Sequence, residues 1–403
     1  MLKGNAVVGQ SGGPTSVINS SLRGVIEAAV RQDAFTGIYG MRWGIEGFMK
    51  EMLVDLRKED PRTVAALRYT PSSALGSSRH KLKEPDFPVI LNVLKKFNIR
   101  YFFMIGGNDS MDTINRVEAY CKKNGYDLHG IGVPKTVDND LFGTDHTPGY
   151  PSAARYVALS VEQGGRLARD MQKVDQYVIY QAVGRDSGWL ASAAVAAKCN
   201  EADPPHIILI PERAFEQDKF LDKVEECYKK YGFCSISCGE GIHYADGTPV
   251  SASVTKDRFG NIEFGAMGGT SAAMMLHKMI GDRFKGWRGE FQVVESLQMC
   301  GSDRTSELDL EEAYLCGMRA VELAGEGKTG LMVSLQRGKK CGCYCTKLGT
   351  AKLADVAVKA KPMPDEFIDQ SGMFVTEAFV DYLAPLVGPM PEMVDLAFHP
   401  VKK

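Results

Sequence analysis

Short apolar runs alternate with amphipathic helical patterns along most of the chain. Between two of these runs, for example, Met111, Ile114, Val117 and Cys121 recur at the spacing of one helix face. The runs with the length of a buried strand are residues 6–8, 102–105, 130–133, 177–180, 206–210, 233–237 and 292–295. Such alternation is typical of parallel sheets whose two faces are both covered by helices. The sequence therefore predicts an α/β fold with parallel-rich sheets.

Two polar loops each follow a predicted strand. Residues 106–110 (Gly-Gly-Asn-Asp-Ser) come after the run 101–105, and residues 134–140 (Pro-Lys-Thr-Val-Asp-Asn-Asp) come after the run 131–133. A strand, a helix and a second strand of this total length form a right-handed crossover unit. Both loops are therefore expected at the same edge of one parallel sheet, where open α/β sheets bind their ligands.

The residues of these two loops suit the transfer of a phosphoryl group. Glycines allow backbone N–H groups to approach phosphate oxygens, and the start of a helix favours negative charge. Lys135 can neutralise charge on a phosphoryl group, and Asp138 or Asp140 can accept the proton of an attacking hydroxyl. Paired glycines and an Asp-Asn-Asp segment also occur in purely structural turns. Their shared position at one sheet edge favours a site.

These segments, taken in order along most of the chain, resemble the phosphofructokinase A family and, more narrowly, its pyrophosphate-dependent branch. Residues 7–14 resemble the family's first phosphate-binding loop, and residues 75–79 resemble the loop whose arginine reaches the donor phosphates. The resemblance implies the following contacts to the donor: Gly12, Gly13, Arg79, Gly107, Asp109 and Ser110. It also implies a Mg²⁺ ligand at Asn108, where the family often has aspartate. An amide oxygen can coordinate this cation but adds no charge, so we expect weaker or mainly substrate-borne Mg²⁺.

Two positions bear on the identity of the donor. The resemblance implies that ATP-using relatives have glycine at the positions of Asp109 and Lys135. A carboxylate at 109 would stand where the α-phosphate of ATP lies, and like charges there oppose nucleotide binding. The ammonium of Lys135 offers a cation to a short inorganic donor. The sequence therefore predicts pyrophosphate as the phosphoryl donor.

The acceptor side is implied by two further segments. Val183-Gly184-Arg185 resembles the family's Met-Gly-Arg segment, and Glu240 stands where the family binds sugar hydroxyls. With Thr136 and Asp138, these residues would surround the acceptor. The roles implied are Asp138 as the base with Asp140 beside it, and Lys135, Thr136 and Arg185 as groups that balance the charge of the transferred phosphoryl.

The pocket for the sugar 6-phosphate departs from the family pattern. Ser296 stands in place of a histidine or tyrosine, and both Met299 and Gln176 stand in place of arginines. A phosphate dianion prefers charged, bidentate donors, which these three residues do not supply. The acceptor therefore stays open between fructose 6-phosphate, a related ketose, an unphosphorylated polyol and a sulfonated ketose. An ATP-dependent 6-phosphofructokinase and a non-catalytic regulatory homologue are the remaining alternatives.

The resemblance also implies two Rossmann-like lobes with the active site in the cleft between them. Residues 1–148 plus about 296–345 would form the donor lobe, and residues 149–295 plus about 346–403 the acceptor lobe. Members of the family assemble as homodimers or homotetramers, so we expect the same here.

The composition of the chain argues against several classes of protein. A formal net charge of −2 argues against general affinity for nucleic acid, and no apolar run is long enough to span a membrane. The ten cysteines show no secreted disulfide framework. Cys341, Cys343 and Cys345 are spaced more closely than typical zinc ligands, which favours reduced structural cysteines. We expect a cytoplasmic enzyme.

Overall fold

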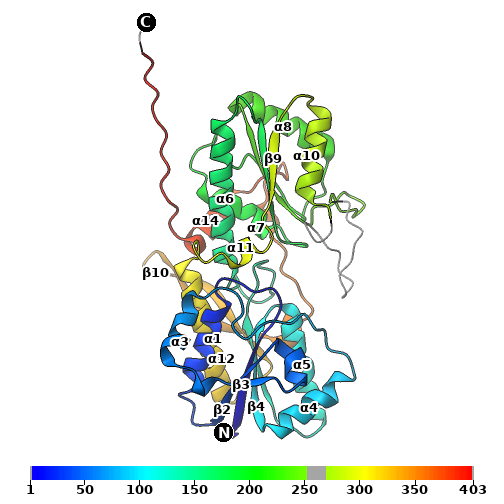
Figure 1. The fold of residues 1–403 in the computed structure, drawn as a ribbon, viewed down its shortest axis with the longest axis vertical. Helices are drawn as coiled ribbons and strands as arrows, with labels where there is room; N and C mark the ends of the chain where they lie inside the picture. The colour runs from blue at the N-terminus through cyan, green and yellow to red at the C-terminus, as the bar shows by residue number, and fades with distance from the viewer. Residues whose placement is uncertain (1, 252–268, 402–403) are drawn as a thin grey trace.

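Two lobes, each built on its own sheet, are stacked one above the other in the computed structural model (Figure 1). The structure describes residues 2–251 and 269–401. The N-terminus lies at the base of the first lobe (Figure 1). The C-terminal segment is extended, has no regular secondary structure and projects away from both lobes.

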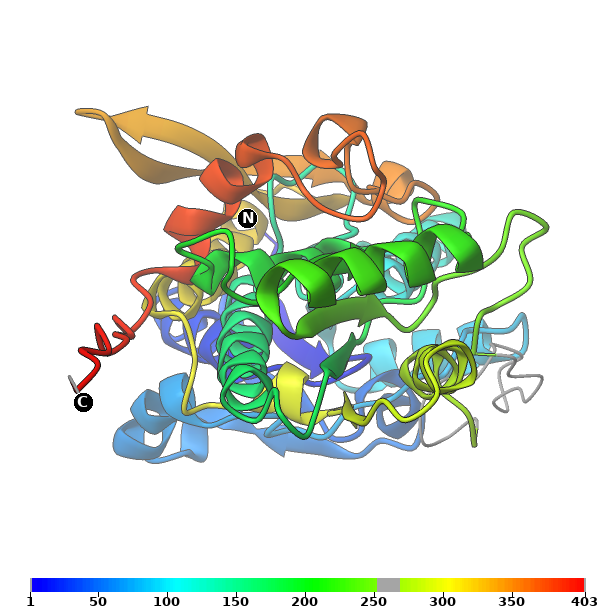
Figure 2. The ribbon, with the colours of Figure 1, turned by 90° about the horizontal axis from the view of Figure 1, so that it is seen from above.

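The first lobe contains a seven-stranded sheet in the order β11-β10-β5-β4-β1-β2-β3. Its strands are β1 (Gly4–Gln10), β2 (Phe35–Met41), β3 (Leu53–Asp55), β4 (Ile99–Gly106), β5 (His129–Pro134), β10 (Leu331–Lys340) and β11 (Cys343–Lys352). The central strands β2, β1, β4 and β5 pair in parallel, which confirms the parallel-rich sheet predicted from the sequence, although β2 itself was not predicted. The hairpin of β10 and β11, in orange, projects at one side (Figure 2).

Helices cover both faces of this sheet because successive side chains of a buried strand point to opposite faces. Phe103 and Ile105 of β4 pack with helices α1 and α12, whereas Phe102 and Met104 pack with α2, α4, α5 and α13. The helices of this lobe are α1 (Ile18–Ala29), α2 (Gly44–Met49), α3 (Pro61–Ala66), α4 (Asp86–Lys96), α5 (Asn108–Lys123), α12 (Glu307–Gly325) and α13 (Leu353–Val356), with the short 3₁₀ helices η1 (Leu56–Lys58) and η2 (Leu67–Tyr69).

The second lobe contains a four-stranded parallel sheet in the order β7-β8-β6-β9. Its strands are β6 (Tyr177–Ala182), β7 (Ile207–Leu209), β8 (Cys234–Gly239) and β9 (Gly289–Val293). Its helices are α6 (Tyr150–Asp170), α7 (Trp189–Ser192), η3 (Ala193–Ala197), α8 (Gln217–Tyr231), α10 (Ala272–Arg283), α11 (Leu297–Cys300), η4 (Asp365–Phe367) and α14 (Glu377–Val387). Here too, apolar helices pack on both faces of the sheet.

The chain crosses between the lobes more than once. It enters the second lobe with α6, returns to the first with α12, and reaches the second again with α14, which packs against α6. The expected boundary near residue 345 falls inside β11, and the two strands of this hairpin are paired from Leu331 with Lys352 to Lys340 with Cys343. A paired hairpin cannot be divided between lobes, so residues 346–352 lie with the first sheet. Leu353 and Val356 of α13 pack in the core of the same lobe.

Strand register brings the predicted loops to one edge. Gln10 of β1 lies opposite Ile105 of β4, and Gly106 of β4 lies opposite Pro134 of β5. The loops that follow these three strands therefore leave the sheet together. In the second lobe Ala182 lies opposite Gly239, so the loops that carry Arg185 and Glu240 also emerge side by side.

Candidate active site

The ammonium group of Lys135 lies against the glycine loop that follows β1. Lys135 Nζ donates to the Gly13 carbonyl oxygen at 2.8 Å, and the Gly12 N–H donates to the Ser78 carbonyl at 3.1 Å. Gly12 has φ +77°, a left-handed conformation that favours glycine. Burial lowers the pKa of Lys135 to about 8, although the charge of Asp138 opposes this effect and that of Arg79 adds to it. The glycine loop and the positive charges of Arg79 and Lys135 thus lie close together.

The second glycine loop leads directly into α5. A side chain at Gly106 would collide with Ser110 Oγ, and Gly107 precedes the helix as its N-cap residue. Asn108 Oδ1 is buried and has no hydrogen-bond partner within residues 2–251 and 269–401. An orphaned amide oxygen at a helix start fits a hard cation such as Mg²⁺. The Asp109 carboxylate is exposed and pairs with Lys81 Nζ at 3.5 Å.

The aspartates lie on a tight turn after β5. The Asp138 N–H donates to Thr136 Oγ1 at 3.1 Å, and Asn139 between the two aspartates has φ +55°. Burial and the charge of Asp140 raise the pKa of Asp138 to about 7, against the lowering effects of Arg185 and Lys135. Burial likewise raises the pKa of Asp140. A carboxyl group that titrates near neutrality is suited to accept a proton from a hydroxyl.

Arg185 and Glu240 face this turn from the second lobe. The Gly184 N–H donates to Glu240 Oε1 at 3.2 Å, and the φ of +129° at Gly184 is one that few other residues adopt. Burial raises the pKa of Glu240 to about 7, and the nearby charges of Asp138 and Glu295 act in the same direction. The positive charge of Arg185 lowers the pKa of both Asp138 and Glu240. The structure therefore brings Asp138, Arg185 and Glu240 together, as the sequence suggests.

The two lobes also meet through direct contacts at this point. Ser187 Oγ donates to the Asp138 carbonyl oxygen at 3.0 Å, which joins the arginine loop to the aspartate turn. The Ser16 N–H donates to the Met299 carbonyl at 3.0 Å, and a methyl group placed on Gly13 would lie 3.2 Å from Met299 Cε. Met299 thus packs beside the glycine loop that follows β1.

The other residues near the expected acceptor end have different surroundings. Gln298 Oε1 accepts from the Val183 N–H at 3.1 Å, while its buried Nε2 finds no partner in the described parts of the chain. Ser296 is exposed at the start of α11. Gln176 lies at the opposite end of β6 from Val183, where its Oε1 accepts from the Arg288 N–H at 2.9 Å. A strand of this length spans roughly 20 Å, so within one chain Gln176 is remote from the acceptor cage.

The sequence missed the residues that support the aspartate turn from behind. Asn139 is fully buried, and its side chain contacts Tyr382 and Lys361. No local motif marks Lys361 or Tyr382, which come from the C-terminal part of the chain.

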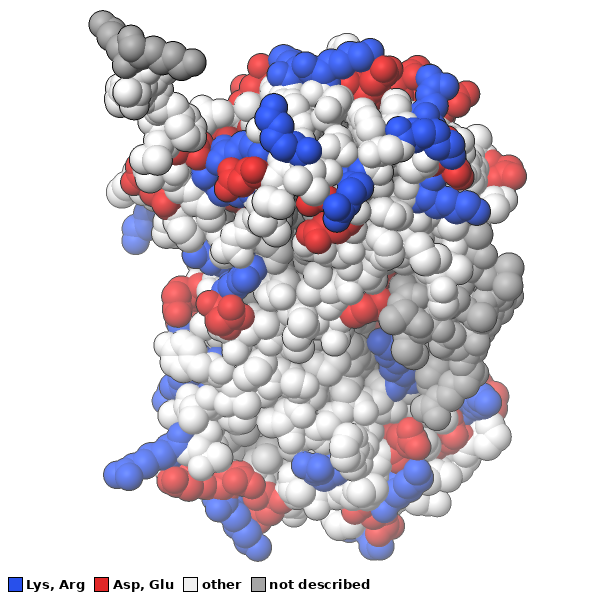
Figure 3. Space-filling view, turned by 45° about the horizontal axis from the view of Figure 1, so that its top comes forward, with Lys and Arg blue, Asp and Glu red and all other residues white. Residues whose placement is uncertain are grey.

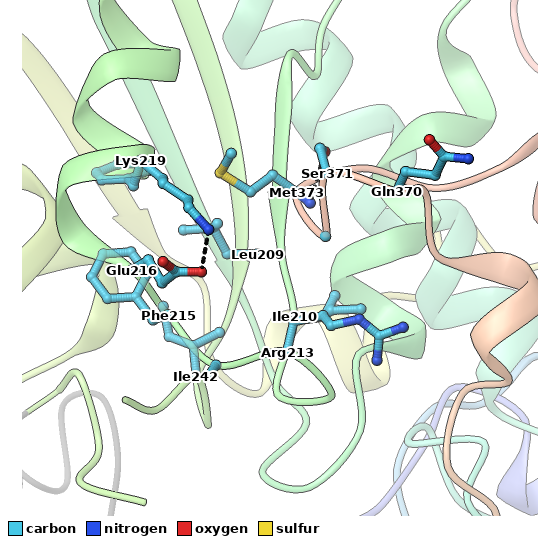
Figure 4. A pocket seen from close by; sticks show the side chains of 13 residues that line it. Leu209, Ile210, Arg213, Phe215, Glu216, Lys219, Ile242, Gln370, Ser371 and Met373 are labelled. Carbon is cyan, nitrogen blue, oxygen red and sulfur yellow. Dashed lines mark hydrogen bonds and ion pairs between the residues drawn. The ribbon is translucent and has the colours of Figure 1, made fainter. Parts of the chain in front are cut away.

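A separate cavity of about 300 Å³ lies in the second lobe, beside the start of α8 (Figure 4). Apolar side chains such as Phe215, Ile242 and Met373 line it. Two of its charged side chains have partners: Lys219 Nζ contacts Glu216 at 2.7 Å, and Arg213 contacts Asp365, outside the lining, at 2.8 Å. None of the predicted site residues lines this cavity. The candidate active site is therefore distinct from it.

The surface shows charges of both signs. On the face in Figure 3, basic and acidic side chains interleave at both ends, and the middle of that face is largely uncharged.

Within the described residues, no helix combines the length and the apolar character needed to cross a membrane. All ten cysteines are free thiols; Cys343 and Cys345 lie on β11, and Cys341 lies in the hairpin turn before it.

The known proteins that are similar to this chain are phosphofructokinases and related sugar kinases. A model of the phosphofructokinase family matches residues 5–324. The pyrophosphate–fructose 6-phosphate 1-phosphotransferase of Halomonas elongata is 38% identical, over 100% of this chain and 98% of the relative. The sulfofructose kinase of Alkalicoccus urumqiensis is 32% identical, over 90% of this chain and 91% of the relative. The crystal structure of a pyrophosphate-dependent phosphofructokinase from Nitrosospira multiformis superposes with a TM-score of 0.86 and 35% identity, covering 98% of this chain and 94% of that one.

Proposed function

Because the chain belongs to the phosphofructokinase family, we propose that it transfers a phosphoryl group reversibly from pyrophosphate to a hydroxyl of fructose 6-phosphate or a related ketose. The observation that carries this proposal is the position of Lys135. Its buried ammonium lies 2.8 Å from the Gly13 carbonyl and interacts electrostatically with Asp138. One cation therefore serves both the donor loop and the residue expected to activate the acceptor.

Pyrophosphate is favoured over ATP by the two side chains at positions 109 and 135. The Asp109 carboxylate stands exposed at the start of α5, so it would repel a longer polyphosphate chain that extends toward that helix. Lys135 occupies the space beside Gly12, where Nζ would lie 3.2 Å from an added methyl group. Relatives 36–39% identical over nearly the whole chain carry the name pyrophosphate–fructose 6-phosphate 1-phosphotransferase, which supports this donor.

The reaction follows from the charges around Asp138. Asp138 accepts the proton of the acceptor hydroxyl as its oxygen forms a bond to the transferred phosphorus, and the bond to the bridging oxygen of pyrophosphate breaks to release orthophosphate. Lys135, Thr136 and Arg185 stabilise the charge spread over the phosphoryl oxygens, and Asp140 lies beside the base. Donor and product have similar transfer potential, so the reaction is reversible.

Asn108 would hold the Mg²⁺ that accompanies pyrophosphate. Its buried, unpartnered Oδ1 fits such a ligand, although as a neutral group it binds more weakly than a carboxylate. Bound Mg²⁺ would neutralise part of the charge of the donor. Gly12, Gly13, Arg79, Gly107 and Ser110 complete the donor site in this proposal.

A sulfonated ketose or an unphosphorylated polyol is the second candidate for the acceptor. Ser296 and Met299 offer no positive charge for a phosphate, and one relative of this chain is named sulfofructose kinase. Steady-state kinetics with pyrophosphate and each acceptor would separate them. Efficient turnover of fructose 6-phosphate alone would eliminate the second candidate.

The donor is tested by comparing pyrophosphate with ATP in the purified enzyme. We expect turnover with pyrophosphate, and we expect the double variant Asp109→Gly, Lys135→Gly to gain activity with ATP while it loses activity with pyrophosphate. A wild-type preference for ATP would overturn the donor assignment. Turnover with neither donor would support a non-catalytic homologue.

The remaining assignments belong to the same proposal. Residues 1–148 form the main part of the donor lobe, and the second lobe binds the acceptor. The enzyme works as a homodimer or homotetramer in the cytoplasm, a compartment that suits ten free thiols.

A further inference from the structure

The turn that carries both aspartates is fixed by a buried amide. Asn139 has 0% exposure and a left-handed backbone conformation. Its Oδ1 accepts from the Thr147 N–H at 3.1 Å, and its Nδ2 donates to the Tyr382 hydroxyl at 3.1 Å. Because the backbone passes directly from Asp138 through Asn139 to Asp140, these bonds fix the backbone segment that carries both carboxylates.

Lys361 completes this support from a segment far away in sequence. Its Nζ donates to the Asp145 carbonyl at 2.7 Å, to the Thr144 carbonyl at 3.2 Å and to Asn139 Oδ1 at 3.3 Å. An ammonium group has three protons, so all of them are used. The Lys361 backbone N–H also donates to the Asp140 carbonyl at 2.8 Å. Lys361 therefore contacts the aspartate turn through both its backbone and its side chain.

Lys361 also contacts the loop that delivers Arg185. Lys361 Nζ lies 5.1 Å from the centroid of the Trp189 ring, and Trp189 Nε1 donates to the Lys361 carbonyl at 3.4 Å. Trp189 begins α7, directly after the arginine loop. One residue thus lies between the loop that carries the expected base and the loop that carries the expected phosphoryl-binding arginine.

We propose that Lys361 is a positioning residue for phosphoryl transfer: it holds the Asp138–Asp140 turn and the Arg185 loop in one fixed arrangement. The inference rests on the proposed function for its kinetic consequences, but the structural role can be measured without turnover. Lys361 touches neither the donor loops nor Glu240 through any hydrogen bond of the described residues. Its loss should therefore affect the reaction step more than the binding of either substrate.

The kinetic test compares Lys361→Met with the wild-type enzyme and pairs it with Lys198→Met as a matched control. Lys198 is also a half-buried lysine that donates to backbone carbonyls, those of Glu201 and Asp203, but it has no contact with the aspartate turn. A displacement of catalytic groups by about 1 Å can lower the rate by about 100-fold. We therefore expect Lys361→Met to reduce kcat by about 10- to 100-fold, with both KM values changed less than about threefold. Lys361→Arg should recover much of the loss. Lys198→Met should keep kcat.

A second measurement is independent of activity. Hydrogen–deuterium exchange of the ligand-free enzyme should show faster exchange in residues 136–147 of Lys361→Met, and no such change in Lys198→Met. Should Lys361→Met fail to fold, Lys361→Gln, which keeps a donor without the charge, repeats both measurements. Unchanged exchange in this segment, or a folded Lys361→Met with wild-type kcat, would overturn the inference. An inactive wild-type enzyme would count against the proposed function, and the exchange result would still decide the role of Lys361.

Discussion

Replacement of Asp138 by asparagine should abolish most turnover while it makes the protein more stable. Asparagine has the same shape but cannot accept the proton of the acceptor hydroxyl. The bonds that hold this position, from its N–H to Thr136 Oγ1 and from Ser187 Oγ to its carbonyl, involve only the backbone of residue 138 and are retained. Loss of a general base typically lowers kcat by about 10²- to 10⁴-fold, which raises the activation free energy by roughly 3–5 kcal/mol.

The gain in stability follows from the pKa of the carboxyl group. Its pKa is raised from 3.8 to about 7 in the folded protein, so the folded state retains a proton that the unfolded chain releases. Stability therefore falls as the pH rises through this range, and the full difference corresponds to about 4 kcal/mol above pH 7. Asp138 keeps some contact with solvent, which screens this effect. We therefore expect about 1–2 kcal/mol in favour of the asparagine variant at alkaline pH and almost none at acidic pH.

Two assays check this prediction together. Orthophosphate release from pyrophosphate measures kcat, and urea unfolding at alkaline and acidic pH measures the free energy of unfolding. Asp186→Asn is the matched control, because the Asp186 carboxylate also raises the pKa of Asp138 but has no assigned role in the reaction. The control should keep turnover within a few-fold. Near-normal kcat in Asp138→Asn would refute the base assignment, and lower stability at alkaline pH would refute the reasoning about its pKa.

Other side chains give further expectations. Lys135 loses its charge above its pKa of about 8 in the free enzyme. The KM of the wild-type enzyme for pyrophosphate should therefore rise from neutral to alkaline pH. A KM that does not change with pH would contradict the role of Lys135 in binding the donor. Glu240→Gln removes a charged acceptor of hydrogen bonds, which should raise the KM for the sugar by about tenfold and leave the KM for pyrophosphate unchanged in steady-state kinetics. Asn108→Ala should raise the Mg²⁺ concentration needed for half-maximal activity, and Asn108→Asp should lower it; identical Mg²⁺ titrations would exclude Asn108 as a ligand.

Much of the fold could be predicted because its strands are buried on both faces. Apolar runs such as residues 101–105 and 177–180 need no tertiary information to be recognised, and every strand predicted from the sequence is present. The strands that were missed, β2, β3, β10 and β11, include more polar or glycine-rich positions and lie toward the edges of the first sheet. Edge strands are partly exposed, so the apolar signal that marks a central strand is weak there.

The candidate site was predictable to the extent that its residues follow predicted strands. The loops at 106–110 and 134–140 meet at one sheet edge, and the parallel register of β6 and β8 brings Gly184 and Glu240 close to each other. The supporting residues could not be found in this way. Asn139 is one polar residue among several in its loop, and Lys361 lies in the irregular segment between α13 and η4.

The sequence by itself determined the alternation of strands and helices, and with it the edge of each sheet at which glycines, aspartates and Arg185 emerge. This information is local, because side-chain periodicity and strand direction are set within each element. Only the tertiary structure decided how the two lobes meet. Ser187 Oγ donates to the Asp138 carbonyl, and Lys361 lies between the aspartate turn and Trp189. Lys361 and Asn139 are 222 positions apart in the sequence, and the bond between Ser187 and Asp138 depends on how the two lobes pack. A local sequence pattern carries no information about either contact.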